Sequence, residues 1–292
     1  MTEFITQDIT YPCSYDLSEQ PARVLQATRP GRPLLVYLHA WSWGYRQPEP
    51  QELSGWCDRH DWNLILPHFR GPSWNPQSCG HEAAIQDIAD AVAYAIRTFQ
   101  ADPANVFLCG CSGGGFHTLL MAGHHPHLWK GVSAWVPISD LVAWHHQPAA
   151  IQAGYAAHIE AVCGGDPQSD PAAAANAAHR SPLTYLEPNL PCIIDLNAGI
   201  HDGHSGPVPV SHALNAFNAC VLPEDRIPQE DIDAMTDGEA VPDRLRLQDD
   251  LPGFDGYHAL YRRQADQTTV TLFEGGHEIV PNAVIAWLER LA

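Results

Sequence analysis

Short apolar runs recur along this chain, and each has the length of a strand rather than of a helix. Continuous runs of this kind are typical of strands that are buried on both faces of a parallel sheet. We expect such strands over residues 33–39, 62–67, 106–110, 131–137, 191–198 and 269–274.

Helical spacing appears between these runs. From Glu82 to Phe99 the apolar residues recur every three or four positions, which predicts a helix with one buried face. Helices are also expected over Phe116–Gly123 and Pro281–Ala292, and a pair of strands over Phe4–Tyr11 and Ala22–Ala27. Because strands alternate with helices, the pattern predicts an α/β fold with a mostly parallel central sheet and helices on both faces.

We expect one domain over residues 1–292, with two segments outside the minimal pattern. Residues 141–190 are rich in Ala, His and Pro and are expected to form cap helices. Residues 221–256 are rich in Asp, Glu and Pro and have few large apolar side chains. We expect them to form an acidic surface excursion that buries little. The alternative is a rim at the active site that repels anionic substrates.

Composition narrows the choice of partners. The net charge is −19, which argues against nucleic acid or an anionic membrane as a partner. No apolar stretch approaches the length of a membrane span, so no membrane partner is expected. The N-terminus has neither the basic nor the apolar region of a secretion signal, which favours the cytoplasm. A secreted protein whose leader is absent from this sequence remains the alternative, and a homo-oligomer is compatible with these features.

The eight cysteines contain no C-x-x-C pair, so zinc ribbons and thioredoxin-like motifs are not expected. We therefore expect the cysteines to be free thiols, and we expect Cys111 to pack behind Ser112 without reacting. One disulfide that involves Cys79 or Cys163 is left open.

The most informative motif is Gly110-Cys111-Ser112-Gly113-Gly114, which follows the strand at 106–110 and precedes a helical run. In this G-x-S-x-G pattern a tight turn between strand and helix lifts the serine hydroxyl clear of the backbone. Ser112 is therefore the candidate nucleophile.

A nucleophilic serine needs a base and an orienting carboxylate, which follow it in the order Asp or Glu, then His. His277 follows the last expected strand through a glycine turn, and Asp202 follows the strand before it. Asp195, inside that strand, and Asp140 are the competing carboxylates. His201 and His204 flank Asp202, but they lack further ligands at metal spacing, so no metal is expected.

The tetrahedral intermediate needs hydrogen-bond donors, and the backbone N–H of Gly113 is the first candidate. The second is the N–H of Trp41, with Ser42 as the alternative, in the turn after the strand at 33–39. Side chains at the carboxyl ends of neighbouring strands face the same edge of the sheet. We therefore expect the substrate pocket to be lined by Trp41, Trp43, Arg70 and Trp74.

Together these residues resemble the α/β-hydrolase superfamily, and within it the catalytic domain of the prolyl oligopeptidase-like (peptidase S9) serine hydrolases. The likeness spans roughly residues 30–292. It rests on the elbow at 110–114, on Gly199-Ile200-His201-Asp202 leading to Val208-Pro209-Val210-Ser211, and on Gly275-Gly276-His277. The resemblance implies that Ser112, Asp202 and His277 form the catalytic triad and that no cofactor is needed.

This sequence departs from the family pattern in two ways that affect which substrate is expected. The turn reads His39-Ala40-Trp41 where many relatives have His-Gly, and no Glu-Glu pair is placed to hold a free peptide N-terminus. Some relatives look like esterases that remove acyl groups from plant polysaccharides. We therefore expect an enzyme that cleaves carboxylic esters of small molecules or oligosaccharides. The alternatives are a small-peptide hydrolase on the same triad and a non-catalytic binding protein with a vestigial site.

Overall fold

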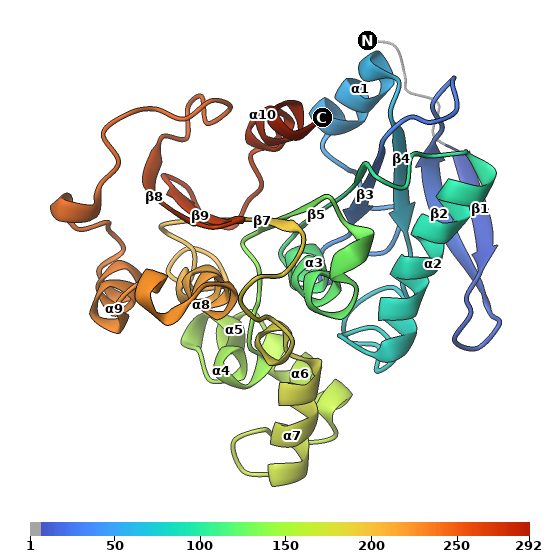
Figure 1. Cartoon of the computed structure of the whole chain (residues 1–292). Helices are drawn as coiled ribbons and strands as arrows, with labels where there is room; N and C mark the ends of the chain where they lie inside the picture. The colour runs from blue at the N-terminus through green and yellow to red at the C-terminus, as the bar shows by residue number, and fades with distance from the viewer. Residues whose placement is uncertain (1–6) are drawn as a thin grey trace.

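The computed structural model describes residues 7–292, except for the side chains of residues 149 and 150. A nine-stranded sheet crosses the molecule in the order β1-β2-β4-β3-β5-β6-β7-β9-β8 (Figure 1). The six strands from β4 to β9 in this order run parallel, as the sequence predicts, whereas β1, β2 and β8 pair antiparallel to their neighbours.

The expected strands are present with bounds that differ by a few residues. Residues 4–6 of the first expected strand lie outside the described residues. One edge strand, β8, was not predicted, because Arg262, Arg263 and Gln264 interrupt its apolar pattern. The strands are β1 Gln7–Pro12, β2 Glu19–Leu25, β3 Leu34–Leu38, β4 Asn63–Pro67, β5 Val106–Cys111, β6 Gly131–Trp135, β7 Ile193–Gly199, β8 Ala259–Ala265 and β9 Thr268–Phe273.

Helices cover both faces of the sheet. On one face α2 (Glu82–Thr98), α3 (Gly113–His124) and α8 (Ser211–Cys220) pack on the strands, and on the other lie α1 (Gln51–His60) and α10 (Pro281–Leu291) (Figure 1). Each layer buries its own apolar cluster against the sheet. Helix α1 was not predicted, because apart from Leu53, Trp56 and Cys57 its residues are polar or small.

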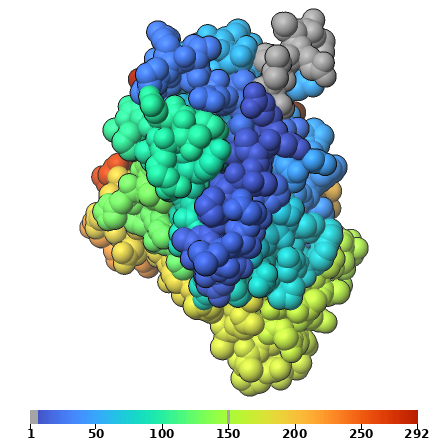
Figure 2. Space-filling view, turned by 90° about the vertical axis from the view of Figure 1, so that its right-hand side faces the viewer, coloured from blue at the N-terminus to red at the C-terminus, as the bar shows by residue number. Residues whose placement is uncertain are grey.

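Residues 141–190 form the helices α4 (Leu141–His145), α5 (Pro148–Gln152), α6 (Tyr155–Cys163) and α7 (Pro171–Arg180). Figures 1 and 2 both show α6 and α7 projecting at one end of the molecule, in yellow-green. Figure 2 looks onto the edge of the sheet where β1 and β2 lie at the surface. We call α4–α7 the cap helices.

The acidic segment 221–256 is more firmly packed than its composition suggests. It contains α9 (Gln229–Gly238), and its apolar residues Ile227, Ile232, Met235 and Val241 are buried in the main core. The expectation that this segment buries little is therefore wrong. Its few apolar side chains are spaced so that one side of α9 packs on α8. Of the acidic residues in α9, Asp231 is buried and pairs with Arg244.

The lengths of the helices and the state of the cysteines complete the description of the fold. None of the helices in residues 7–292 is both long and apolar enough to cross a bilayer. All eight cysteines fall in this range and all are free, so the structure does not contain the disulfide that was left open for Cys79 or Cys163.

Candidate active site

Ser112 occupies a strained turn between β5 and α3. Its backbone has φ 59° and ψ −118°, a conformation that residues other than glycine seldom adopt. The N–H of Ser112 donates to the carbonyl of Trp135 at 2.8 Å, and its own carbonyl accepts from Phe116 in the first turn of α3. The turn is thus fixed from both sides, and it presents the hydroxyl at the start of the helix.

His277 bridges Ser112 and Asp202. Its Nε2 lies 2.8 Å from Ser112 Oγ, and its Nδ1 lies 2.6 Å from Asp202 Oδ2. With the proton on Nδ1, the ring donates to the carboxylate and Nε2 accepts from the serine hydroxyl. The structure therefore brings together the three side chains that the sequence selected, from positions up to 165 residues apart.

Asp202 is held by the loop that carries it. Its second oxygen, Oδ1, accepts hydrogen bonds from the N–H groups of Gly203 and Val208, each at 3.0 Å. A Cβ on Gly206 would lie 2.4 Å from that oxygen and 2.7 Å from Cβ of His277, so only glycine fits beneath the pair. The carboxylate is 2% exposed, and its orientation is set before a substrate arrives.

The competing carboxylates lie elsewhere. Asp195 accepts from Ser133 Oγ at 2.8 Å and from Asn197 Nδ2 at 2.7 Å, within the sheet. Asp140 caps α4 by accepting from the N–H groups of Val142 and Ala143. Neither contacts His277.

Two backbone N–H groups adjoin the serine. A Cβ on Gly113 would lie 2.4 Å from the backbone nitrogen of Trp41, so the turn after β3 presses directly against the start of α3. Within residues 7–292 no hydrogen bond occupies the N–H of Gly113 or of Trp41. The two unused donors lie side by side next to Ser112, as an oxyanion hole requires.

Substitution of Gly113 by alanine should push Trp41 away and separate these two donors. Loss of one such donor typically lowers kcat about 10²- to 10³-fold, and we expect a fall of that order on any substrate that this serine hydrolase cleaves. Steady-state kinetics of Gly113→Ala beside Gly238→Ala would measure it. A Cβ at Gly238 meets no atom within 4 Å, so this control should behave as the wild type. Equal rates for the two variants would contradict the assignment of the Gly113 and Trp41 N–H groups as the oxyanion donors.

An aromatic cluster surrounds Trp41, whose backbone adjoins the start of α3. Trp41 contacts the rings of Trp144 and Tyr155 at centroid distances of 4.9 and 6.0 Å, and its indole N–H donates to His158 at 3.3 Å. Trp74 lies 5.1 Å from the His158 ring. Burial lowers the pKa of His158, so the wall formed by these five side chains is uncharged at neutral pH.

Of the predicted pocket residues, the structure thus brings Trp41 and Trp74 together. The other three residues of the aromatic wall, Trp144, Tyr155 and His158, come from the cap helices. They were not predicted, because no sequence pattern connects them with the motif at 110–114. The only available signal was the spacing of Tyr155 and His158, which places both on one side of a helix.

The other two predicted pocket residues are not part of this wall. Trp43 is 52% exposed and has no ring contact with the cluster within the described range. Arg70 is buried, and its guanidinium is bound by Asp87 at 2.8 Å and Asp16 at 2.7 Å. The assignment of Arg70 to the pocket is therefore wrong: its charge joins the β1–β2 turn to α2.

His201 and His204 do not converge on a common point. His201 lies between Glu274 and Glu239, with its Nδ1 2.9 Å from the Glu239 carboxylate, whereas His204 contacts the carbonyl of Thr236. The hydrogen bond to Glu274, followed by that to Glu239, raises the pKa of His201. Because Glu239 follows α9, this ion pair ties the acidic segment to the loop that carries Asp202.

This ion pair predicts a pH-dependent stability. A histidine whose pKa is raised by folding stabilises the protein below its unfolded pKa, and the contribution is lost as pH rises through the folded pKa. His201→Asn should therefore lower the melting temperature at about pH 5.5 and leave it nearly unchanged at about pH 9. Thermal unfolding of both proteins across this range measures the difference. A gap between them that is constant with pH would show that the charge of His201 does not matter.

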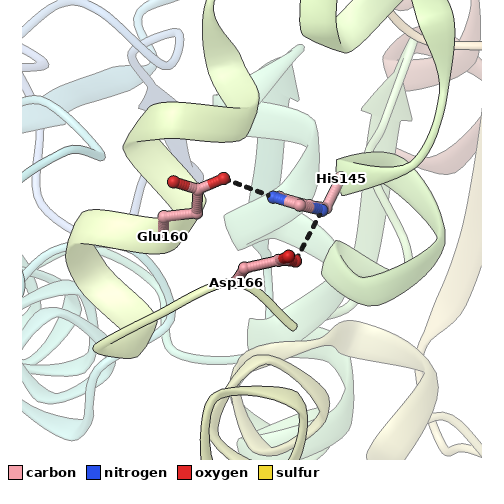
Figure 3. A group of neighbouring side chains, drawn as sticks. All are labelled: His145, Glu160 and Asp166. Atoms are coloured by element: carbon pink, nitrogen blue, oxygen red, sulfur yellow. Dashed lines mark hydrogen bonds and ion pairs between the residues drawn. The ribbon is translucent and has the colours of Figure 1, made fainter. Parts of the chain in front are cut away.

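Among residues 7–292, one group of side chains has the composition of a metal site: His145, Glu160 and Asp166 (Figure 3). Glu160 lies 3.0 Å from Nε2 of His145, whereas Asp166 lies 3.8 Å from Nδ1, at the other nitrogen of the ring. A metal ion binds one ring nitrogen and would leave one carboxylate on the far side. The arrangement instead fits a bridge that joins α4, α6 and the turn after α6.

Comparison with known proteins identifies the family of this chain. The sequence model of the prolyl oligopeptidase family (peptidase S9) matches residues 70–229, which include Ser112 and Asp202. A curated acetylxylan esterase from Coprinopsis cinerea is 42% identical over 48 residues, which are 16% of this chain and 13% of that protein.

Solved structures that resemble this one include peptidases. Acylaminoacyl peptidase from Pyrococcus horikoshii has a TM-score of 0.67 at 16% identity, over 99% of this chain and 42% of that one. A puromycin-hydrolysing peptidase from Mycobacterium tuberculosis has a TM-score of 0.61 at 17% identity, over 99% of this chain and 39% of that one. This chain thus spans less than half the length of these relatives, and at such identities the likeness establishes the fold alone.

Proposed function

The chain belongs to the prolyl oligopeptidase family of serine hydrolases and has the α/β-hydrolase fold, and on this basis we propose that it cleaves carboxylic esters through an acyl-enzyme on Ser112. The observation that carries the proposal is the hydrogen-bonded chain from Ser112 Oγ through His277 to Asp202, at a strained turn. A serine in this setting has a base for its proton and donors for the charge that develops on the substrate.

The mechanism follows from the geometry. Ser112 Oγ attacks the ester carbonyl carbon while its proton moves to His277 Nε2, and Asp202 stabilises the imidazolium that forms. The N–H groups of Gly113 and Trp41 bind the oxyanion of the tetrahedral intermediate. When that intermediate collapses, the bond to the alcohol oxygen breaks and His277 protonates the leaving alcohol. Water, deprotonated by His277, then releases the acid and regenerates Ser112.

The aromatic wall supports a neutral substrate. Its members Trp41 and Trp144 are buried, and the members that reach the surface are Tyr155, His158 and Trp74. These three carry no charge at neutral pH, which suits a short uncharged acyl group or a sugar ring. A peptide with a free N-terminus would need a carboxylate to receive its ammonium group. In the cap helices Glu160 is already occupied by His145. The local likeness to an acetylxylan esterase points the same way and suggests acetylated oligosaccharides as substrates.

Peptide cleavage is the second candidate, because similar solved structures include peptidases. Release of acetate from an acetylated xylo-oligosaccharide, compared with cleavage of dipeptide amides with free and blocked N-termini, separates the two. Unactivated substrates are needed, because nitrophenyl esters react with many nucleophiles. We expect acetate release that Ser112→Ala abolishes and that EDTA leaves unchanged.

The alternative outcomes are distinct. Cleavage of the peptides with no acetate release would replace the esterase assignment by a peptidase on the same triad. No turnover of either class by a folded wild-type protein would favour a binding protein with a vestigial site.

A further inference from the structure

The face of the sheet that α1 and α10 cover is apolar over its central strands but polar at the edge formed by β7, β9 and β8. Beneath α1 and α10 the strands β3, β4 and β5 present apolar side chains such as Leu35, Leu64 and Phe107. Farther along the same face, β7 presents Asp195 and Asn197, β9 presents Thr269 and Thr271, and β8 presents Arg262 and Gln264. The strand register aligns Asp195 with Thr269 and Gln264, and Asn197 with Thr271 and Arg262.

These polar side chains line an open hollow rather than packing against the helix. Between the sheet, α10 and the turn at 251–254 lies a cavity of about 450 Å³, whose walls include Trp135, Asp195, Arg262, Gln264, Trp287 and Arg290. An adjoining cavity of about 340 Å³ shares Asp195, Arg262, Gln264, Trp287 and Arg290, with Asp266 at its outer rim. We call the two together the α10 hollow. Its volume is in the range of small-ligand sites.

Two guanidinium groups in the α10 hollow lack a counter-ion. Arg262 is partly buried, and its Nη1 donates to Thr271 Oγ1 at 3.0 Å; Arg290 comes from the last turn of α10. Within the described residues neither forms an ion pair, although Arg70 and Arg244 each pair with a buried aspartate. Burial lowers the pKa of Arg262, the charge of Asp195 opposes this shift, and Arg290 adds to it, so the two arginines and Asp195 lie near one another. A partly desolvated cation such as Arg262 is stabilised when an anion binds beside it.

Asp195 lies near both arginines in the hollow but forms no ion pair with either. Both of its hydrogen bonds, from Ser133 and Asn197, fall on Oδ2, and it lies beyond ion-pair distance of both arginines. Burial raises the pKa of Asp195, whereas the hydrogen bonds from Ser133 and Asn197 and the charges of Arg262 and Arg290 lower it. The α10 hollow therefore contains two cations, the carboxylate of Asp195, which is bound within the sheet, and the exposed carboxylate of Asp266.

We propose that the α10 hollow is a binding site for a small oxyanion, a carboxylate or a phosphate monoester, held by the guanidinium groups of Arg262 and Arg290. Planar guanidinium groups match the geometry of both anions and can bind either one with paired hydrogen bonds. The site is separate from Ser112, since none of its lining residues belongs to the triad or the aromatic wall. The proposal does not depend on the ester activity.

Titration calorimetry on the whole chain tests the site, with citrate and inorganic phosphate as probes and glycerol as a neutral control. Because the net charge of −19 repels anions, saturable binding must come from a local cationic site. We expect wild type to bind at least one anion, and Arg262→Gln and Arg290→Gln each to weaken that binding at least about tenfold. A preference for citrate or for phosphate identifies which of the two classes is the ligand.

The matched control is Arg97→Gln, since Arg97 is an exposed arginine in the last turn of α2 just as Arg290 is in the last turn of α10. It should bind as the wild type does. Arg290 is exposed and forms no ion pair in residues 7–292, so its substitution leaves the proposal testable even if Arg262→Gln unfolds the protein. The proposal fails if neither anion binds, if Arg290→Gln binds unchanged, or if Arg97→Gln weakens binding equally.

Discussion

Ser112→Ala should reduce hydrolysis at least about 10³-fold and leave the fold intact, because the variant lacks the hydroxyl that His277 contacts. Alanine adds no bulk at a turn that Ser112 already strains, and the hydrogen bonds of that turn are formed by its backbone. The residual rate would come from the oxyanion donors of Gly113 and Trp41 acting on water. Circular dichroism and thermal unfolding of the variant show whether the loss is chemical, and turnover near the wild-type rate would remove Ser112 from the mechanism.

Asp202→Asn should lower kcat by about 10³- to 10⁴-fold with little change in melting temperature. An amide cannot accept the Nδ1 proton of His277 and stabilise the imidazolium as a carboxylate does, although it can retain bonds with the N–H groups of Gly203 and Val208. The effect should therefore appear in kcat and not in the free energy of unfolding.

Asp195→Asn is the matched control for this substitution, since both aspartates are buried and both lie at β7 or directly after it. Burial raises the pKa of Asp195, so ionising it costs stability as pH rises above the unfolded pKa. The neutral variant should act on stability: at neutral pH it should be at least as stable as the wild type and retain its activity. If Asp195→Asn were the folded but inactive variant, the carboxylate of the triad would be misassigned.

The hydrogen-bonded arrangement of Ser112, His277 and Asp202 was predictable because each of these residues follows a strand end. Buried parallel strands are recognisable as apolar runs, and the fold places their carboxyl ends at one edge. Seventeen histidines are present, yet position alone selects His277, after the last strand and a glycine turn. The same reasoning selected Asp202 over Asp195, because only Asp202 lies beyond the strand.

Features that depend on long-range contacts were not predictable. Arg70 follows a strand end as the site residues do, but Asp16 and Asp87, which bind it, are distant in the sequence. The aromatic wall draws on the cap helices, whose packing leaves no periodic signal. Strand β8 was not predicted because its residues Arg262 and Gln264 are polar. They are polar because they line the α10 hollow and do not pack in an apolar core.

The central claim is that the hydroxyl of Ser112 is the activated nucleophile of this protein. A fluorophosphonate probe reacts with serines that are activated by a neighbouring base, and mass spectrometry of the intact protein and its peptides locates the adduct. We expect a single adduct on Ser112 in the wild type, none in Ser112→Ala, and much slower labelling of Asp202→Asn. An adduct on another residue, or an unlabelled Ser112 in folded wild-type protein, would contradict the account.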